Sequence, residues 1–292
     1  MRRFTVALCL TVGLAAVVVG SGGIASSSPA KSGASGRSPH GGVLVRTNAR
    51  AALPVHGGTV TSLNWAGYAV TSTTPTITSV TSTFIVPSAG LLPPGFAATW
   101  AGIGGFGTSD LIQAGVAEQS LPSLPLVGAQ YYAWYEMLPN AEVQLTGCAA
   151  APGYPGDADA NCTVAPRDSM AVIIQQAGNN SWTIALADTT RHWTWEPLPF
   201  PYQSSKSSAE WITEAPTLVA LQTIIAPLST VSFGGTSTYT QAGYTHTIAK
   251  GSPTTVVLSP GLINEATPSA LATDGQSFNV CTYAQTCATP AP

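Results

Sequence analysis

The sequence predicts an all-β protein, a sandwich of two antiparallel sheets. Short stretches that alternate in polarity or are rich in β-branched residues recur along the chain, each bounded by Gly, Pro, Asn or Asp. No segment has the long amphipathic period of a capped helix. Roughly 235 residues of such strands, without an interior linker or repeat, fit one large sandwich of the concanavalin-like or jelly-roll type.

The clearest strands follow one another along the chain and end at turn residues. The tripeptide GNN at 178–180 predicts a hairpin turn between two of them. The expected strands are TITSVTSTFIVP (76–87), AEVQLTG (141–147), SMAVIIQQAG (169–178), SWTIALAD (181–188) and PTTVVLSP (253–260).

Residues 1–25 have the order of a secretory signal peptide. Arg2 and Arg3 precede an apolar run at 4–19, and small residues follow. A transmembrane anchor is the alternative, but the run is shorter than the roughly 20 residues that a bilayer needs. We therefore expect a secreted, extracellular protein that does not stay in the membrane after signal removal.

Residues 26–55 are predicted to be a propeptide or a disordered linker before a single β-sandwich domain at 56–292. The stretch at 26–50 is rich in Ser, Gly and Ala, carries four basic residues and contains no acid. Such a composition does not bury enough apolar surface to fold alone. As a propeptide, its cations could cover an acidic cleft.

The rest of the chain is acidic and poor in charge. From residue 51 on, all thirteen acids remain beside four basic residues, a formal charge of −9. Nucleic acid is therefore not an expected partner. Once the acids protonate, few charges are left to repel one another, which suits work at low pH. Replacement of charge by Thr and Ser on a β surface explains the same composition.

Four cysteines remain after the signal, in two pairs that are local in the sequence. We expect disulfides Cys148–Cys162 and Cys281–Cys287, although four cysteines allow three connectivities. Neither CxxC nor His spacing favours a metal site, so neither metal nor cofactor is expected.

Common catalytic signatures are missing. The sequence contains no GxSxG elbow, no HExxH helix and no Asp-Thr-Gly or Asp-Ser-Gly. GIGGFG at 102–107 matches GxGxxG, but a strand follows it rather than the helix that a dinucleotide site requires. His192 and His246 have no evident nucleophile partner, and a histidine is protonated in acid. The remaining candidates for catalytic groups are therefore carboxylates and amides.

Six motifs resemble those of the glutamic peptidases, or eqolisins, in their order and approximate spacing. The similarity covers about 64–216 and continues weakly through TVSFGG (230–235). Each motif is weak alone, but six in order are specific. They are LNWAGYAV (63–70), STFIVP (82–87), TWAGIGG (99–105), LIQAGV (111–116), YYAWYEMLP (131–139) and AEWITEAP (209–216).

The resemblance implies a sandwich of two antiparallel sheets and a catalytic Gln–Glu dyad on one concave sheet. The matching positions are Gln113 and the second glutamate of AEWITE, Glu214. It implies a secreted, pepstatin-insensitive endopeptidase that acts in acid on proteins or peptides, which we expect to be a monomer. Supporting or substrate-binding positions are Glu136, Glu210, Trp65, Trp100 and Trp134, although tryptophans of a sandwich usually belong to the core.

A glutamate and a glutamine suit peptide hydrolysis in acid. An ionised Glu can deprotonate water and later return the proton to the leaving amine, and an unperturbed Glu titrates near 4.3. A Gln amide is a neutral donor at every pH, so it can stabilise an oxyanion where a His would be charged. An outward polar residue on a strand is the plain alternative for Gln113.

In a strand, Glu210 and Glu214 point to one face. We expect Glu214 to be the base and Glu210 to orient the site. Three positions that are acidic in the family have lost the acid, namely Gly104, Tyr132 and Ala215. Fewer like charges would leave Glu214 less perturbed and broaden the active pH range.

Two other function classes fit a secreted β protein. In RHWTWEPLPFPY (191–202), Trp193 and Trp195 could form the stacking platform of a carbohydrate-binding module. A glycoside hydrolase could pair Glu214 with Glu210 or with Glu136. Neither alternative requires the amide of Gln113 beside Glu214.

Overall fold

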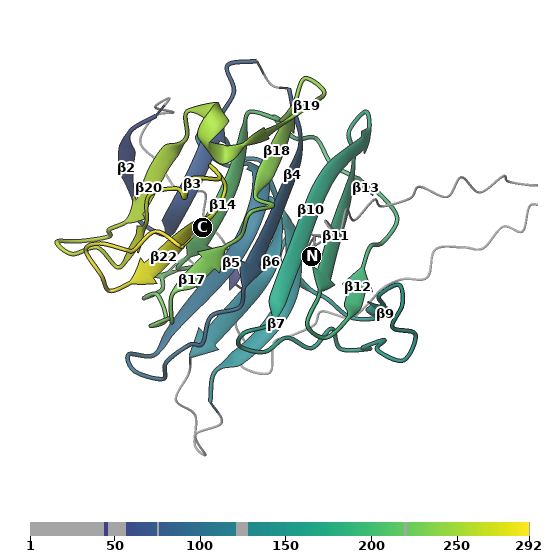
Figure 1. Cartoon of the computed structure of the whole chain (residues 1–292), viewed down its shortest axis with the longest axis horizontal. Coiled ribbons are helices and arrows are strands. Elements are labelled where there is room, and N and C mark those ends of the chain that lie inside the picture. The colour runs from purple at the N-terminus through teal and green to yellow at the C-terminus, as the bar shows by residue number, and fades with distance from the viewer. Residues whose placement is uncertain (1–43, 46–56, 75, 121–127, 219–220, 292) are drawn as a thin grey trace, which may run out of the picture. The chain divides into compact units, whose positions relative to one another are not determined.

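The computed structural model is a two-layered β structure. It describes residues 44–45, 57–74, 76–120, 128–218 and 221–291, where every regular element is a strand except the 3-10 turn η1 (Ile248–Gly251). Figure 1 shows β4 and β10 crossing in front of β5 and β6. The predicted all-β sandwich class is confirmed.

The first sheet contains the strands with the sequence motifs. Its neighbouring strands are antiparallel, except that β2 runs parallel to β20. In spatial order they are β2 (Thr59–Ser62), β20 (Thr254–Leu258), β3 (Trp65–Thr71), β14 (Ser208–Glu214), β5 (Gly95–Gly104), β6 (Leu111–Ser120), β7 (Gln130–Met137) and β8 (Val143–Gln144).

The second sheet packs against the first and is joined to it at one edge. In order it contains β19 (Tyr244–Thr247), β18 (Thr238–Gln241), β4 (Ile77–Ile85), β10 (Ser169–Gly178) and β11 (Ser181–Asp188), followed by β12 (Trp193–Trp195) and β13 (Phe200–Pro201). The link from β4 to β20 runs through β17 (Val231–Phe233), β22 (Phe278–Thr282) and β21 (Ala266–Pro268).

Short strands lie outside this order. β9 (Ala149–Ala150) pairs with β12, while β1 (Leu44–Val45), β15 (Thr217–Leu218) and β16 (Leu221–Gln222) form a separate small sheet.

Burial differs between the two sheets. In β11, buried side chains alternate with half-buried ones, as expected for a strand with one face on the core. β5, β6 and β14 are buried along almost their whole length. The main hydrophobic core lies between the sheets, and a smaller cluster around Trp65, Trp100 and Trp134 covers the other face of the first sheet. This second covered face carries the predicted site.

Most expected strands are present. The stretches at 76–87, 169–178, 181–188 and 253–260 contain β4, β10, β11 and β20. The hairpin at 178–180 is also present, with Gly178 opposite Ser181. The strand predicted at 141–147 is wrong in length, because only Val143–Gln144 pairs there and the chain then turns through Gly147 towards the Cys148 loop.

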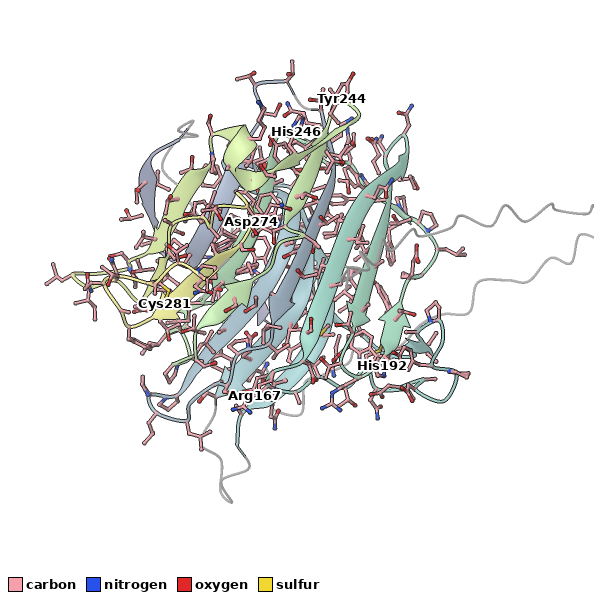
Figure 2. The ribbon with its side chains drawn as sticks, viewed as in Figure 1. Arg167, His192, Tyr244, His246, Asp274 and Cys281 are labelled. Carbon is pink, nitrogen blue, oxygen red and sulfur yellow. A yellow bond between two sulfur atoms is a disulfide. The ribbon has the colours of Figure 1, made fainter. Side chains whose placement is uncertain are left out.

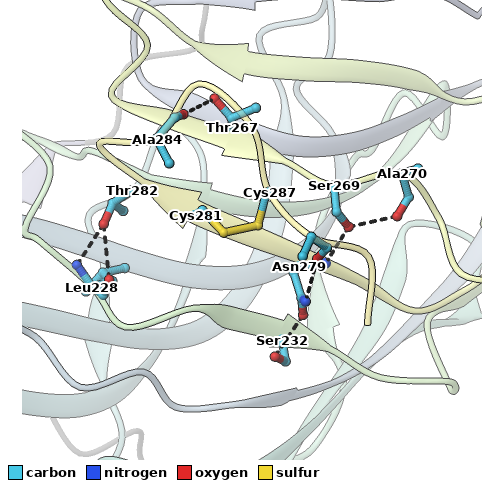
Figure 3. Close-up of a disulfide and its surroundings, with 11 residues drawn as sticks. Leu228, Ser232, Thr267, Ser269, Ala270, Asn279, Cys281, Thr282, Ala284 and Cys287 are labelled. Carbon is cyan, nitrogen blue, oxygen red and sulfur yellow. Dashed lines mark hydrogen bonds between the residues drawn. A yellow bond between two sulfur atoms is a disulfide. The ribbon is translucent and has the colours of Figure 1, made fainter. Parts of the chain in front are cut away.

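Both expected disulfides are present. Cys148–Cys162 closes the loop between β8 and β10, with a Cα–Cα distance of 5.3 Å. Cys281–Cys287 ties the C-terminal segment to β22, where Thr282 also hydrogen-bonds the backbone of Leu228 (Figure 3). Such bonds form in oxidising compartments, which agrees with an extracellular location.

The predicted signal peptide at 1–25 lies outside the described residues, as does the segment at 26–55 apart from β1. No helix in the described part of the chain is long and apolar enough to span a membrane.

A buried acid lies at the end of β11, away from the predicted site. The side chain of Asp188 is 0% exposed, and one carboxylate oxygen accepts the backbone N–H groups of Thr190 and Arg191. The other oxygen lies 3.9 Å from Arg191 Nε, which itself contacts Asp168 at 2.5 Å. Burial, with added repulsion from Asp168, raises the pKa of Asp188 to about 6.

We expect Asp188→Asn to stabilise the protein at neutral pH by about 1–2 kcal/mol. The folded protein binds this proton more tightly than the unfolded chain, so wild-type stability falls as the pH rises from about 4 to about 6. Asn keeps the acceptor oxygen without the charge. Urea unfolding at several pH values measures the difference, which should vanish near pH 4.

Asp274 is a control residue, because its pKa is shifted in the opposite direction to that of Asp188. Although burial acts to raise its pKa, hydrogen bonds from the Ser277 side chain and from backbone N–H groups prevail, so the pKa of this exposed acid is lowered. Asp274→Asn should therefore destabilise the protein at neutral pH and have less effect in acid. An Asp188→Asn effect that is the same at every pH would contradict the assignment.

Candidate active site

One row of side chains crosses four neighbouring strands of the first sheet. Glu210 of β14 lies opposite Gly102 of β5, Gly102 lies opposite Gln113 of β6, and Gln113 lies opposite Glu136 of β7. Residues directly opposite in a sheet point to the same face. This row therefore brings together Gln113 and two of the predicted supporting glutamates.

Glu214 lies on the same face, four residues further along β14. Its neighbours across the strands are Trp65 of β3 and Ala98 of β5. Gln113, Glu210 and Glu214 are each 0% exposed. The two members of the predicted dyad thus share one face and one buried environment, but they do not lie in the same row.

The amide of Gln113 has a defined orientation. Its Nε2 donates to Glu136 Oε2 at 2.6 Å. A carboxylate only accepts hydrogen bonds, so this contact assigns nitrogen and oxygen of the amide. Gln113 Oε1 is buried and has no hydrogen-bond partner among the described residues. The second N–H of the amide remains for another acceptor.

Two neutral donors hold the carboxylate of Glu214. Trp100 Nε1 donates to Oε2 at 2.8 Å, and Asn64 Nδ2 lies 3.3 Å from Oε1. The backbone carbonyl of Asn64 also accepts from Ala215 N at 2.8 Å, which fixes the end of β14. Hydrogen bonds to a carboxylate favour its ionised form.

Glu210 is as buried as Glu214 but differs in its hydrogen bonds. Neither carboxylate oxygen has a partner of ordinary hydrogen-bond geometry among the described residues. Burial raises the pKa of Glu210 well above its usual value, and the charge of Asp110 raises it further. The Ser208 hydroxyl and the Phe106 backbone lower this pKa, but they do not cancel the effect of burial. Glu210 is therefore protonated over a wider pH range than an ordinary glutamate, and the two glutamates of AEWITE are chemically unequal.

Neighbouring side chains fill the space above Gly102, between Gln113 and Glu210. A Cβ at position 102 would lie 3.0 Å from Leu111 Cδ1 and 3.0 Å from Trp100 Cζ3. These contacts are tighter than ordinary packing allows. Glycine is the residue that lets neighbouring side chains close over the strand at this point.

The three predicted groove tryptophans are buried in the smaller cluster. Trp65 and Trp100 pack edge to face with a centroid distance of 5.0 Å, and Trp134 is 0% exposed. Trp100 contacts Glu214 directly. The other two belong to the packing around the site, as tryptophans in a sandwich usually do.

Two residues at the site were not singled out from the sequence. Asn64 stands inside the LNWAGYAV motif, but only the fold brings it to Glu214. Asp110 lies in the β5–β6 loop, where it accepts from Ser205 N at 2.6 Å. A Cβ at Gly104 would lie 2.6 Å from Asp110 Oδ2. The family's acid is missing at 104, but another carboxylate lies beside that position.

The carbohydrate platform predicted at Trp193 and Trp195 is wrong for Trp193. That side chain is 0% exposed, and its Nε1 donates to the carbonyl of Thr163. Trp195 stacks on Tyr135 with centroids 5.2 Å apart. One buried indole and one half-buried indole do not form a flat exposed surface.

The histidines do not form a site together. Figure 2 shows His192 and His246 near opposite ends of the molecule. His192 Nδ1 lies 3.0 Å from Asp157 Oδ2, in a loop far along the chain from Gln113. Among the described residues, no cluster of His, Cys, Asp and Glu has the geometry to hold a metal ion.

Comparisons with known proteins agree with the sequence motifs. The family model described as the peptidase A4 family matches residues 63–271. A search of curated protein sequences finds no significant match.

Solved structures of low sequence identity share the fold. Scytalido-glutamic peptidase with a transition state analog inhibitor is 17% identical, with a TM-score of 0.59, and the match covers 75% of this chain and 98% of that one. SCP-B, a member of the eqolisin family of peptidases in a complex with the tripeptide Ala-Ile-His, is 18% identical, with a TM-score of 0.54 and the same coverage.

Proposed function

Because the chain belongs to the peptidase A4 family, we propose that it is an endopeptidase that uses Gln113 and Glu214 to hydrolyse peptide bonds in acid. One observation carries the proposal. An oriented amide and a carboxylate held by two neutral donors share one buried face of the first sheet. The complex of the structural relative SCP-B with a tripeptide supports peptides as the substrate class.

In the proposed reaction, ionised Glu214 removes a proton from a water molecule, and the water oxygen attacks the peptide carbonyl carbon. The second N–H of Gln113 donates to the oxyanion that develops on the carbonyl oxygen. Protonated Glu214 then passes its proton to the amide nitrogen, and the C–N bond breaks. Glu214 ends the cycle ionised, so no further group is consumed.

The assignment of Glu214 rather than Glu210 as the base follows from their surroundings. A base must be ionised at the working pH. Both carboxyl groups are buried, but Trp100 and Asn64 donate to Glu214, and hydrogen bonds of this kind favour the ionised form of a carboxylate, whereas burial raises the pKa of Glu210. The low charge of the secreted domain supports work in acid, because few positive groups repel one another there.

We expect the secreted protein to cleave an acid-denatured protein substrate between about pH 2 and pH 5, near the ordinary titration of a glutamate. Pepstatin should not inhibit the reaction, because the chain has neither of the aspartic peptidase motifs. Mass spectrometry of the digest at several pH values, with and without pepstatin, provides the measurement. Loss of cleavage with pepstatin, or no cleavage at any pH, would contradict the proposal.

A further inference from the structure

The aromatic stretch at 191–202 ends in Tyr202, and its phenol lies at one end of the ladder between β6 and β7. Continuing the register of this ladder by one residue places Leu111 opposite Leu138. Leu138 N donates directly to Leu111 O at 2.9 Å. The return connection runs through the phenol, because Leu111 N donates to Tyr202 Oη at 2.7 Å and Tyr202 Oη donates to Leu138 O at 3.1 Å.

The Tyr202 hydroxyl takes the place of a backbone hydrogen bond. Opposed residues of this kind in an antiparallel ladder ordinarily exchange two direct N–H···O bonds. A hydroxyl group both accepts and donates, so it can be inserted between the N–H and the carbonyl without leaving either unpaired. The inserted oxygen therefore closes this end of the ladder at a wider strand spacing than a direct bond would give.

The contact between Gln113 and Glu136 lies two residues inward from this closure. Their side chains come from facing strands, so the 2.6 Å bond from Nε2 to Oε2 depends on the spacing of β6 and β7. On the outer side of β7, β8 pairs among the described residues only over Trp134 and Tyr135. The ladder with β6, closed by Tyr202, is thus the strand contact that positions Glu136.

The phenol remains a donor in acid. Burial raises the pKa of Tyr202, and the charges of Asp110 and Glu136 raise it further, although the hydrogen bond from the Leu111 backbone acts to lower it. The closure therefore persists at pH values where carboxyl groups change their protonation state.

The second sheet and the loop before β6 hold the backbone around Tyr202. Tyr202 N donates to Asn180 O at 2.9 Å, and Trp182 Nε1 donates to Tyr202 O at 3.1 Å. Three residues further on, Ser205 N donates to Asp110 Oδ2 at 2.6 Å. The chain then enters β14, the strand of the proposed base. The phenol is therefore presented to β6 and β7 from a backbone that is fixed on both sides.

Building on the proposed function, we propose that Tyr202 is a positioning residue for Gln113. Its hydroxyl sets the spacing of β6 and β7 at which the Gln113 amide meets Glu136, and so directs the second N–H of the amide towards the oxyanion. Tyr202 acts through Gln113 and takes no part in proton transfer.

Tyr202→Phe removes one oxygen atom and keeps the ring. We expect kcat to fall by about tenfold or more, because a small misplacement of a catalytic group is costly, while KM stays within about threefold of wild type. Tyr131→Phe is the matched control. Tyr131 lies near the other end of β7, and its hydroxyl also accepts a backbone N–H, that of Ala89, at 2.7 Å.

The two variants separate positioning from packing. Both should unfold at lower urea concentration than wild type, because each leaves a backbone N–H without its acceptor. Only Tyr202→Phe should lower kcat. A folded Tyr202→Phe protein with the kcat of wild type would refute the positioning role.

The side-chain amide of Gln113 provides a readout that requires no peptide cleavage. Its N–H signals in a proton–nitrogen NMR spectrum are identified by their loss in Gln113→Met. Tyr202→Phe should shift or broaden them, and Tyr131→Phe should leave them in place. The amide of Gln119, which donates to Tyr132 Oη from the far end of β6, is an internal reference that neither variant should move. Unchanged Gln113 signals in folded Tyr202→Phe would overturn the inference.

These measurements distinguish failure of the inference from failure of the proposed function. If the wild-type protein cleaves no peptide, the proposed function fails, and the NMR comparison still tests Tyr202. If Tyr202→Phe does not fold, hydrogen exchange of the wild-type protein tests the closure instead. The Leu111 amide should then be protected to within about tenfold of the Gly115 amide in the middle of β6, whereas exchange as fast as at a frayed strand end would refute the closure.

Discussion

Glu214→Gln is expected to lower kcat/KM for peptide hydrolysis by about 10³-fold, the upper part of the range for general acid–base groups. Gln matches the shape of Glu but can neither take a proton from water nor return it to the leaving amine. Its Oε1 can still accept from Trp100 Nε1, so the site should keep its packing. Steady-state kinetics on a fluorogenic peptide in acid would measure the loss.

Glu196→Gln is the matched control, because Glu196 is exposed and lies outside the first sheet. It should retain wild-type kinetics. The result for Glu210→Gln completes the comparison, since the two glutamates of AEWITE stand on one strand and differ mainly in their surroundings. If Glu214→Gln stays active while Glu210→Gln is dead, the roles of the two glutamates are reversed.

Gln113→Ala is expected to lower kcat by about 10²- to 10³-fold, the typical effect of removing one oxyanion donor. KM should change less, because the charge on the oxygen develops mainly in the transition state. The substitution also leaves Glu136 without the donor that now lies 2.6 Å away. Measuring kcat and KM separately at several pH values would test whether the loss lies mainly in kcat.

Gln119→Ala controls for the loss of a buried amide from the same strand. Gln119 also lies on β6 and is 5% exposed, but its Nε2 donates to Tyr132 at 3.0 Å. We expect at most a small loss of activity there. Gln113→Met adds a variant that keeps the side-chain volume without the donor. An active Gln113→Met protein would refute the oxyanion role even if Gln113→Ala failed to fold.

The sequence predicts where strands lie better than it predicts which strands pair and over what length. The alternation in SWTIALAD and the turn at GNN are local patterns, and β10, β11 and their hairpin appear where these patterns stand. The stretch AEVQLTG has the same composition but pairs over only two residues. Its pairing depends on where β7 ends and on the loop closed by Cys148, and neither is a local property.

The all-β class, the family and the two local cysteine pairs are predicted from the amino-acid sequence, which also names Gln113, Glu210 and Glu214 as candidate residues. These follow from periodicity, short spacings and motifs within single segments. The folded sheets are needed to see that Gln113 lies in one row with Glu136 and Glu210, and that Trp100 and Asn64 donate to Glu214.

The protonation state of a carboxyl group depends on its hydrogen-bond donors, its burial and the neighbouring charges. For Glu214, the donors come from residues up to 150 positions away in the chain. Two glutamates that look equivalent in AEWITEAP are therefore equally buried but have different hydrogen-bond partners in the folded sheet.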